Sequence, residues 1–158
     1  MLRALAGVAV CAIAFATTVV VQAQGDVRVT TLPREDHVLV SLELTGAYTQ
    51  EIRDAVASGL EATFSFDVEL RQPVALWFDR TVDRASVSAR VRFDGLTGRY
   101  QVTRTVDGAI EQVQVVEEEA AVRQLLTTLG RLPLFSTRAL ETNEDYRVRV
   151  REHASAHR

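Results

Sequence analysis

Residues 63–70 read TFSFDVEL, a strict alternation of polar and apolar side chains. The apolar members fall on every second residue: Phe64, Phe66, Val68 and Leu70. A period of two places these side chains on one side of an extended chain and the polar ones on the other. A strand with one buried and one solvated face is typical of antiparallel sheets, because strands of parallel sheets are covered on both faces. The segment therefore predicts an antiparallel sheet.

The same alternation recurs on both sides of this stretch, which belongs to a predicted strand over residues 61–72. The dipeptide Asp107-Gly108 is a strong hairpin signal, because its residues accommodate the positive φ angles of a tight turn. The other predicted strands are residues 26–32, 38–44, 84–93, 99–106, 109–116 and 146–151, of which 109–116 has the weakest pattern.

Two segments break the alternation and predict short helices. Residues 50–58 follow Thr49, which can cap a helix, and precede Gly59, which can end one. Residues 117–129 open with three glutamates, whose charge suits a helix N-terminus, and precede Gly130.

These elements predict a mainly β fold, an antiparallel β-sandwich-like sheet of about seven strands with two short helices covering an end or an edge. A single curved sheet with both helices on one face is the alternative. We expect one domain over residues 24–152 and a flexible tail over residues 153–158.

The first 23 residues have the three-part pattern of a secretory signal peptide. Arg3 supplies a positive charge, residues 4–21 carry none, and Val21 and Ala23 stand at the positions that a signal peptidase reads. An 18-residue apolar run also lies at the lower limit for spanning a bilayer, so an uncleaved N-terminal anchor is the alternative. Both interpretations predict an exported protein of the periplasm or cell envelope.

Composition narrows the range of partners and cofactors. The 158 residues include 18 basic and 21 acidic ones, and this net charge of −3 argues against nucleic acid as the partner. The one cysteine, Cys11, lies in the predicted signal, which leaves the domain without a disulfide or a thiolate ligand. His153 and His157 have a helical metal-binding spacing but no third ligand near them in the sequence. We expect neither a metal nor another cofactor.

Catalytic motifs do not stand out in this sequence. It has no Gly-x-Ser-x-Gly, no Gly-rich phosphate loop, no His-Glu-x-x-His and no dinucleotide fingerprint. We therefore expect a protein that is not an enzyme, and keep an uncharacterised hydrolase as the less favoured alternative.

The stretch ALWFDR, residues 75–80, holds the only tryptophan of the chain. Pro73 ends the preceding strand, because it cannot donate to a ladder. The favoured interpretation is a buried aromatic plug in which Trp77 and Phe78 form a dense apolar knot. Asp79 would then cap the next turn or pair with Arg80 or Arg84. The alternative is an exposed stacking platform for a ligand or partner.

Arginines are spaced along the polar faces of two predicted strands. Side by side they would form a guanidinium-rich wall for phosphate, lipid headgroups or an acidic polymer. The favoured interpretation pairs them across strands with acidic residues such as Asp67 and Glu69. The arginines are Arg84, Arg90 and Arg92 on one strand and Arg147, Arg149 and Arg151 on the other.

Three motifs occur between the export signal and the second predicted helix. Residues 59–70 lead from a small-residue helix end into an aromatic-acidic strand, residues 77–79 read Trp-Phe-Asp, and residues 96–100 read Leu-Thr-Gly-Arg-Tyr. This order resembles the bacterial exported domain of unknown function 4390 over nearly all of residues 26–151. The chain departs from the family pattern at residues 110–113, where relatives often carry a phenylalanine.

The resemblance implies an envelope location and a β-rich fold, and it implies no activity. It makes Tyr100, the end of the third motif, a candidate structural or interaction residue. Relatives are often encoded beside a membrane sensor kinase, so the implied partner is an envelope protein such as a membrane sensor. Membrane contact is expected only through an uncleaved signal.

From these observations we expect a non-catalytic exported envelope protein that acts as a structural or protein-interaction module. The alternative is a carrier of lipid or another small apolar ligand. Its cleft would lie between sheet and helices and would be lined by Trp77, Phe78, Leu125 and Leu129.

Overall fold

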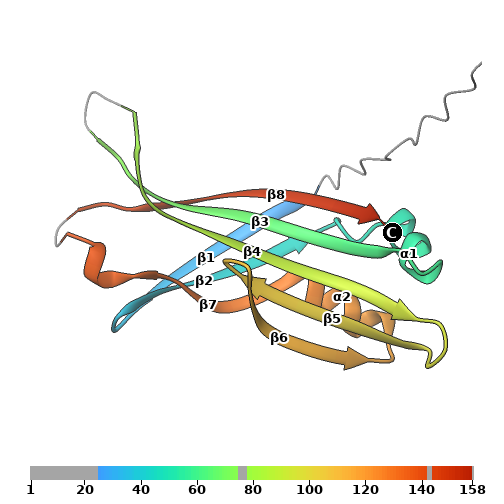
Figure 1. Ribbon diagram of the computed structural model, residues 1–158. Helices are drawn as coiled ribbons and strands as arrows, with labels where there is room; N and C mark the ends of the chain where they lie inside the picture. The colour runs from blue at the N-terminus through green and yellow to red at the C-terminus, as the bar shows by residue number, and fades with distance from the viewer. Residues whose placement is uncertain (1–24, 75–77, 142–143, 158) are drawn as a thin grey trace, which may run out of the picture.

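The computed structural model describes residues 25–74, 78–141 and 144–157, and Figure 1 shows their arrangement. The described chain forms two antiparallel sheets and two α-helices. The first sheet has the order β1 (Asp26–Arg34), β2 (His37–Thr45), β7 (Thr128–Ser136). The second has the order β6 (Ala109–Val116), β5 (Arg99–Val106), β4 (Arg80–Asp94), β3 (Glu61–Gln72), β8 (Arg147–His157). The predicted β-sandwich-like class is confirmed, and the single-sheet alternative is wrong.

Strand β3 is an interior strand of the larger sheet and contains residues 63–70, the stretch of alternating residues. It pairs with β4 on one side and with β8 on the other. Its apolar face is buried throughout: Phe64, Phe66 and Val68 are each 1% exposed. The polar face of the same strand looks away from the core, as its period of two predicts.

Both sheets contribute their inner faces to one hydrophobic cluster. Val40 and Leu42 of β2 enter it from the smaller sheet, and Val87 and Val91 of β4 enter it from the larger one. Leu126 of the second helix is fully buried in the same cluster. The described domain is therefore built around one core.

The two helices cover this core toward the end of the molecule opposite the β3–β4 connection (Figure 1). Helix α1 (Gln50–Ala57) starts at Thr49, whose hydroxyl accepts a hydrogen bond from the Ile52 amide at 3.4 Å. It ends before Gly59, which has a φ of +88° that favours glycine. Helix α2 (Glu119–Thr127) is shorter than predicted.

Strand β7 was not predicted from the sequence. The segment was expected to be helical as far as residue 129, but the helix ends at Thr127 and the chain continues directly into a strand that pairs with β2. Pro133 is tolerated there because β7 is an edge strand, on which a missing N–H need not interrupt a ladder. A short 3-10 helix, Thr137–Ala139, follows.

The expectation of a flexible tail over residues 153–158 is wrong for residues 153–157. They form the second half of β8 and extend its pairing with β3 as far as Glu61. Ala154 and Ala156 continue the inward-facing series opposite Phe64 and Ala62. Alanine side chains add little to a hydrophobic pattern in the sequence, so this half of the strand was not predicted. In the structure they complete the pairing of β8 with the buried strand β3.

The predicted signal peptide or anchor, residues 1–23, lies outside the described residues. Within the described part of the chain, the helices are too short and too polar for any of them to cross a membrane.

Candidate functional site

The connection between β3 and β4 presents an exposed aromatic side chain. The β3–β4 hairpin extends past the rest of the two sheets, at the upper left of Figure 1. Phe78 is 95% exposed there, and Val74 across the connection is 40% exposed. The predicted dense apolar knot is therefore wrong for Phe78. Trp77, its predicted partner, lies outside the described residues.

Main-chain contacts hold the base of this exposed end. The Arg71 guanidinium donates through Nη2 to the carbonyl oxygen of Asp79 at 2.9 Å. Arg80, which is exposed, opens β4 opposite Gln72 in register. Asp79 thus contributes its carbonyl to a contact with Arg71, whereas we had expected its carboxylate to cap a turn or to pair with Arg80 or Arg84. Phe78 lies in the connection that follows the last paired residues, Gln72 and Arg80, and this connection, residues 73–79, is the tip of the hairpin.

The two arginine-bearing strands do not form one basic wall. They are β4 and β8, and β3 lies between them. Glu69 of β3 stands opposite Arg84 on one side and Arg149 on the other. Its carboxylate lies 3.6 Å from the Arg84 guanidinium, and the Glu61 carboxylate lies 3.2 Å from that of Arg90. The favoured prediction of cross-strand pairing thus holds for Arg84 and Arg90.

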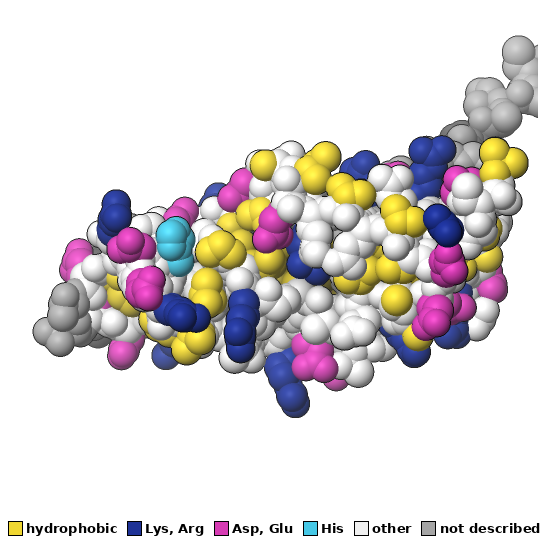
Figure 2. Space-filling view, turned by 90° about the horizontal axis from the view of Figure 1, so that it is seen from below, with side chains coloured by type: hydrophobic (Ala, Val, Ile, Leu, Met, Phe, Trp, Pro, Cys, Tyr) yellow, Lys and Arg dark blue, Asp and Glu magenta, His cyan; other side chains and the backbone are white. Residues whose placement is uncertain are grey.

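The remaining predicted arginines are exposed on the outer face of the larger sheet. Arg92 stands opposite Gln101 of β5, and Arg147 stands opposite Arg71 of β3. Figure 2 shows the molecule from below Figure 1, and on the surface seen there charged side chains of both signs are dispersed among hydrophobic ones. Exposed ion pairs contribute little to stability. Because positive and negative side chains are mixed on the surface, neither anionic nor cationic ligands are favoured.

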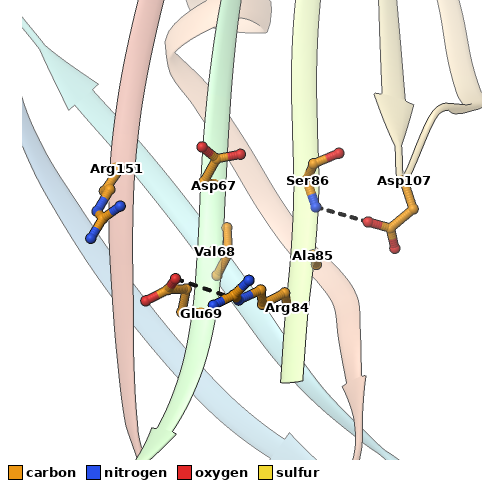
Figure 3. Close-up of a pocket in the computed structure, with 8 residues that line it drawn as sticks. All are labelled: Asp67, Val68, Glu69, Arg84, Ala85, Ser86, Asp107 and Arg151. Atoms are coloured by element: carbon orange, nitrogen blue, oxygen red, sulfur yellow. Dashed lines mark hydrogen bonds and ion pairs between the residues drawn. The ribbon is translucent and has the colours of Figure 1, made fainter. Parts of the chain in front are cut away.

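The outer face of the larger sheet has an open hollow of about 470 Å³, shown in Figure 3. Asp67 and Arg151 lie on its wall, on the neighbouring strands β3 and β8. Asp107, in the β5–β6 turn, accepts a hydrogen bond from the Ser86 amide at 2.8 Å and so ties this turn to β4. The lining combines two arginines with three acidic side chains, so it can hold polar groups without selecting an anion.

A second hollow, of about 220 Å³, lies between the two helices and β5. Tyr48 and Tyr100 both line it, and the Tyr100 ring packs against Phe93 with centroids 4.8 Å apart. Arg53 of α1 lies 3.7 Å from Glu119 of α2, a contact that links the helices. Tyr100, predicted from its motif, therefore lines a hollow between the helices and β5 and packs its ring against Phe93.

Sequence reasoning missed Tyr48 in this cluster. Burial, reinforced by the nearby Glu119 carboxylate, raises the pKa of Tyr48 to about 12, so its phenol stays protonated at neutral pH. A signal was present, because Tyr48 directly precedes the helix cap Thr49, a position that often packs against the first helical turns.

Glu152 is the one acidic side chain on the inward-facing side of β8, opposite Phe66. Its Oε1 accepts a 3.3 Å hydrogen bond from the Gly25 amide, next to the start of β1. Burial raises the pKa of Glu152, and Asp26 adds to the rise, while the Gly25 hydrogen bond and His153 oppose it. Relative to the unfolded chain, the folded state therefore shifts the balance toward the protonated carboxyl.

This shift predicts a pH dependence of stability. A raised pKa in the folded state means that the stabilisation is complete below the ordinary carboxyl pKa and is lost as pH rises through the folded-state pKa. Glu152→Gln, which cannot ionise, should therefore increase the free energy of unfolding at pH 7 by less than about 1 kcal/mol, since the group is partly exposed. The gain should disappear at pH 4. Urea denaturation at both pH values measures it.

Glu43→Gln, on an exposed side chain of β2, is the control for this experiment. An equal gain in both variants would assign the effect to net charge alone. A loss of stability in Glu152→Gln at pH 7 would show that the ionised form is the one favoured by the fold.

Taken together, the fold and these surfaces define a small two-sheet β protein with a charge-balanced outer face and an apolar hairpin end. The chain belongs to the family Domain of unknown function (DUF4390), whose model matches residues 26–155. The resemblance drawn from the sequence motifs is thereby confirmed. No curated protein and no solved structure matches the chain.

Proposed function

We propose that this protein is a non-catalytic exported module of the cell envelope that acts by binding another protein. The observation that carries the proposal is Phe78, a 95% exposed phenylalanine at the tip of the β3–β4 hairpin. Exposing an aromatic ring to water is unfavourable, and aromatic residues are enriched in protein interfaces. An extended hairpin presents such a ring to a partner without disturbing the core.

The positions of the three described cleft residues favour protein binding over a carrier. Phe78 is at the hairpin tip, whereas Leu129 is 1% exposed in the core and Leu125 packs against that core. Trp77 lies outside the described residues. The three described side chains therefore do not line a common cleft.

The proposed location rests on the N-terminal sequence. Arg3, the uncharged residues 4–21 and the small residue Ala23 form the signal pattern, and the family match begins only at residue 26. Export also accounts for the lack of cysteine in the rest of the chain, since an unpaired thiol would be open to oxidation there. The partner we propose is an envelope protein, with a membrane sensor as the candidate that the family resemblance suggests.

Phe78→Asp should abolish partner binding without affecting the fold. The purified wild-type protein and its variants are immobilised and incubated with solubilised envelope fractions, and retained proteins are quantified by mass spectrometry. We expect at least one protein to be retained by wild type and reduced about tenfold or more by Phe78→Asp, the scale of an interface hot spot. The melting temperature should stay within about 2 °C of wild type, because the side chain is exposed.

Leu96→Asp is the matched control, because Leu96 is 99% exposed in the β4–β5 turn, away from the hairpin tip. It should retain the same protein as wild type. Retention of nothing by wild type, or equal loss in both variants, would contradict the proposal. Binding of the wild type to lipid vesicles through Phe78, with no protein retained, would favour the carrier or a membrane contact.

A further inference from the structure

The polarity of edge strand β6 is inverted. Its inward-facing side chains include Gln112 and Gln114, which are half-buried, whereas Val113 and Val115 point outward and are 48% and 60% exposed. Ile110, at the start of the strand, is 68% exposed. A strand that met only solvent on this face would be expected to carry the opposite pattern. The arrangement suggests that the outward valines meet another surface.

β6 also lacks the features that protect the other sheet edges of the described chain. Its ladder partner among the described strands is β5 alone. The edge strand β8 carries alternating arginines, and edge strands β1 and β7 contain Pro33 and Pro133. Charged side chains and prolines at such positions discourage pairing with another chain. β6 has one charged residue, Glu111, and no proline. The shift in its pairing with β5 lies between Ile110 and Gln112, so residues 112–116, which pair regularly, present a backbone edge that is open to a further strand.

We infer that β6 pairs with β6 of a second copy of this chain, antiparallel and about a two-fold axis, to join two larger sheets into one. In antiparallel pairing, facing residues must lie on the same side of the sheet, which excludes half of all registers. Of the remaining registers, the one centred on Gln114 sets Val113 of each copy opposite Val115 of the other. A register centred on Val113 would instead set Glu111 opposite Val115. Valine pairs of this kind stabilise a sheet, so the first register is favoured.

The same register brings complementary features together at the two ends of β6. An open hollow of about 530 Å³ lies beside the C-terminal end of β6, and Val115, Val116 and Ala121 line its apolar part. Ile110, at the opposite end of the strand, reaches this hollow of the second copy when the strands run antiparallel. The exposed side chain of Ile110 thus meets the apolar part of the hollow twice, once for each copy.

The same register brings two like charges together at the rim of the hollow. Glu111 of one copy faces Glu117 of the other, a destabilising pair that Arg99, 2.8 Å from the Glu117 carboxylate, can offset. The Arg99 guanidinium has five donors, so it can serve a second carboxylate as well. The inference is independent of the proposed function, because it uses the β6 edge of the larger sheet and not the β3–β4 connection that carries Phe78.

Sedimentation velocity of the purified protein over a range of concentrations tests the association. We expect a monomer–dimer equilibrium, with a dissociation constant raised at least about tenfold by Val113→Lys, which places charge at the paired edge. Leu32→Lys is the control, because Leu32 is 51% exposed on the edge strand β1, and it should leave the constant unchanged. A protein that stays monomeric up to millimolar concentration, or that loses association equally in both variants, overturns the inference.

Cysteine crosslinking tests the register. In a Cys11→Ala background, Gln114→Cys should form an intermolecular disulfide, because residues facing each other across the axis have Cα atoms about 4.5–5.5 Å apart. Gln112→Cys should not, because the two copies of residue 112 would be about 14 Å apart along the strand. Crosslinking of Gln112→Cys as rapidly as Gln114→Cys, or of neither, overturns the proposed pairing.

Discussion

Phe66→Ala should lower the free energy of unfolding by about 3–5 kcal/mol, as truncations of buried phenylalanines do. Phe66 is 1% exposed and lies on β3, an interior strand of the larger sheet. Val87 of β4 and Glu152 of β8 flank it in register. With strands on both sides, the backbone is not free to move into the space left by the ring. The loss therefore combines the missing apolar burial with a cavity that remains.

Phe78→Ala makes the same chemical change twelve residues further along the chain and should cost less than about 0.5 kcal/mol. The two positions differ chiefly in exposure, 1% against 95%, so the pair isolates the effect of burial. Urea denaturation followed by circular dichroism measures both. The melting temperature of Phe66→Ala should fall by roughly 10–20 °C.

A different result for either variant would change the account of the hairpin. A loss of 2 kcal/mol or more in Phe78→Ala, on the scale of buried side chains, would place the ring in a packed environment. It would restore the interpretation of ALWFDR as an aromatic plug. A small effect of Phe66→Ala would mean that the alternating face of β3 does not form the core.

Phe135→Ala should also lower the free energy of unfolding by about 3–5 kcal/mol. Phe135 is 1% exposed on β7, the strand that the sequence pattern did not predict, and it stands opposite Val38 of β2. Leu129 and Leu132 of the same strand are equally buried. Because β7 completes the smaller sheet, its aromatic side chain closes one side of the core, and its removal leaves a large cavity.

Leu32→Ala is the control for this variant, since Leu32 belongs to the same sheet and is 51% exposed. It should cost less than about 1 kcal/mol. Denaturation midpoints and m-values of both variants provide the measurement. If Phe135→Ala were as mild as Leu32→Ala, residues 128–136 would not be part of the core, and the two-sheet fold would have to be revised.

The strands whose pairing is local could be predicted from the sequence with their bounds. Residues 99–106 and 109–116 form β5 and β6, as the alternation and the Asp107-Gly108 turn predicted. In a hairpin, the turn residues set the register of the strands that flank them. Each strand and its pairing partner then lie within a few residues of each other, so both the strand and its register can be predicted from the sequence.

Strand β7 could not be predicted in this way. Its buried side chains Leu129, Leu132 and Phe135 are spaced three residues apart, a spacing that resembles a helix. The ladder with β2 contains register shifts between Val38 and Leu39 and between Val40 and Leu42. Such irregularities change the period of two, because an extra residue on one strand moves its neighbours to the other face.

The candidate surfaces, like the strands, could be predicted from the sequence only in part. The residue types of the hairpin connection were evident from the sequence, as was the alternation of arginines with apolar residues. Their surroundings were not, because an aromatic run such as Trp77-Phe78 has the same pattern whether it fills a core or extends into solvent. The inverted polarity of β6 became visible only once the other face of that strand was known to be turned toward α2 and the core.

The sequence by itself determined that this chain is an antiparallel β protein with two short helices, and its motifs indicated the family. Period and turn chemistry act over neighbouring residues, so they can be read without the fold. Only the tertiary structure decided that residues 128–136 and 153–157 complete the two sheets, that β3 separates the arginine strands, and that Phe78 stands outside the core. Each of these three outcomes depends on which segment, distant in the sequence, packs beside the residues concerned. Whether a side chain is buried is decided by that neighbouring segment and not by the type of the residue alone.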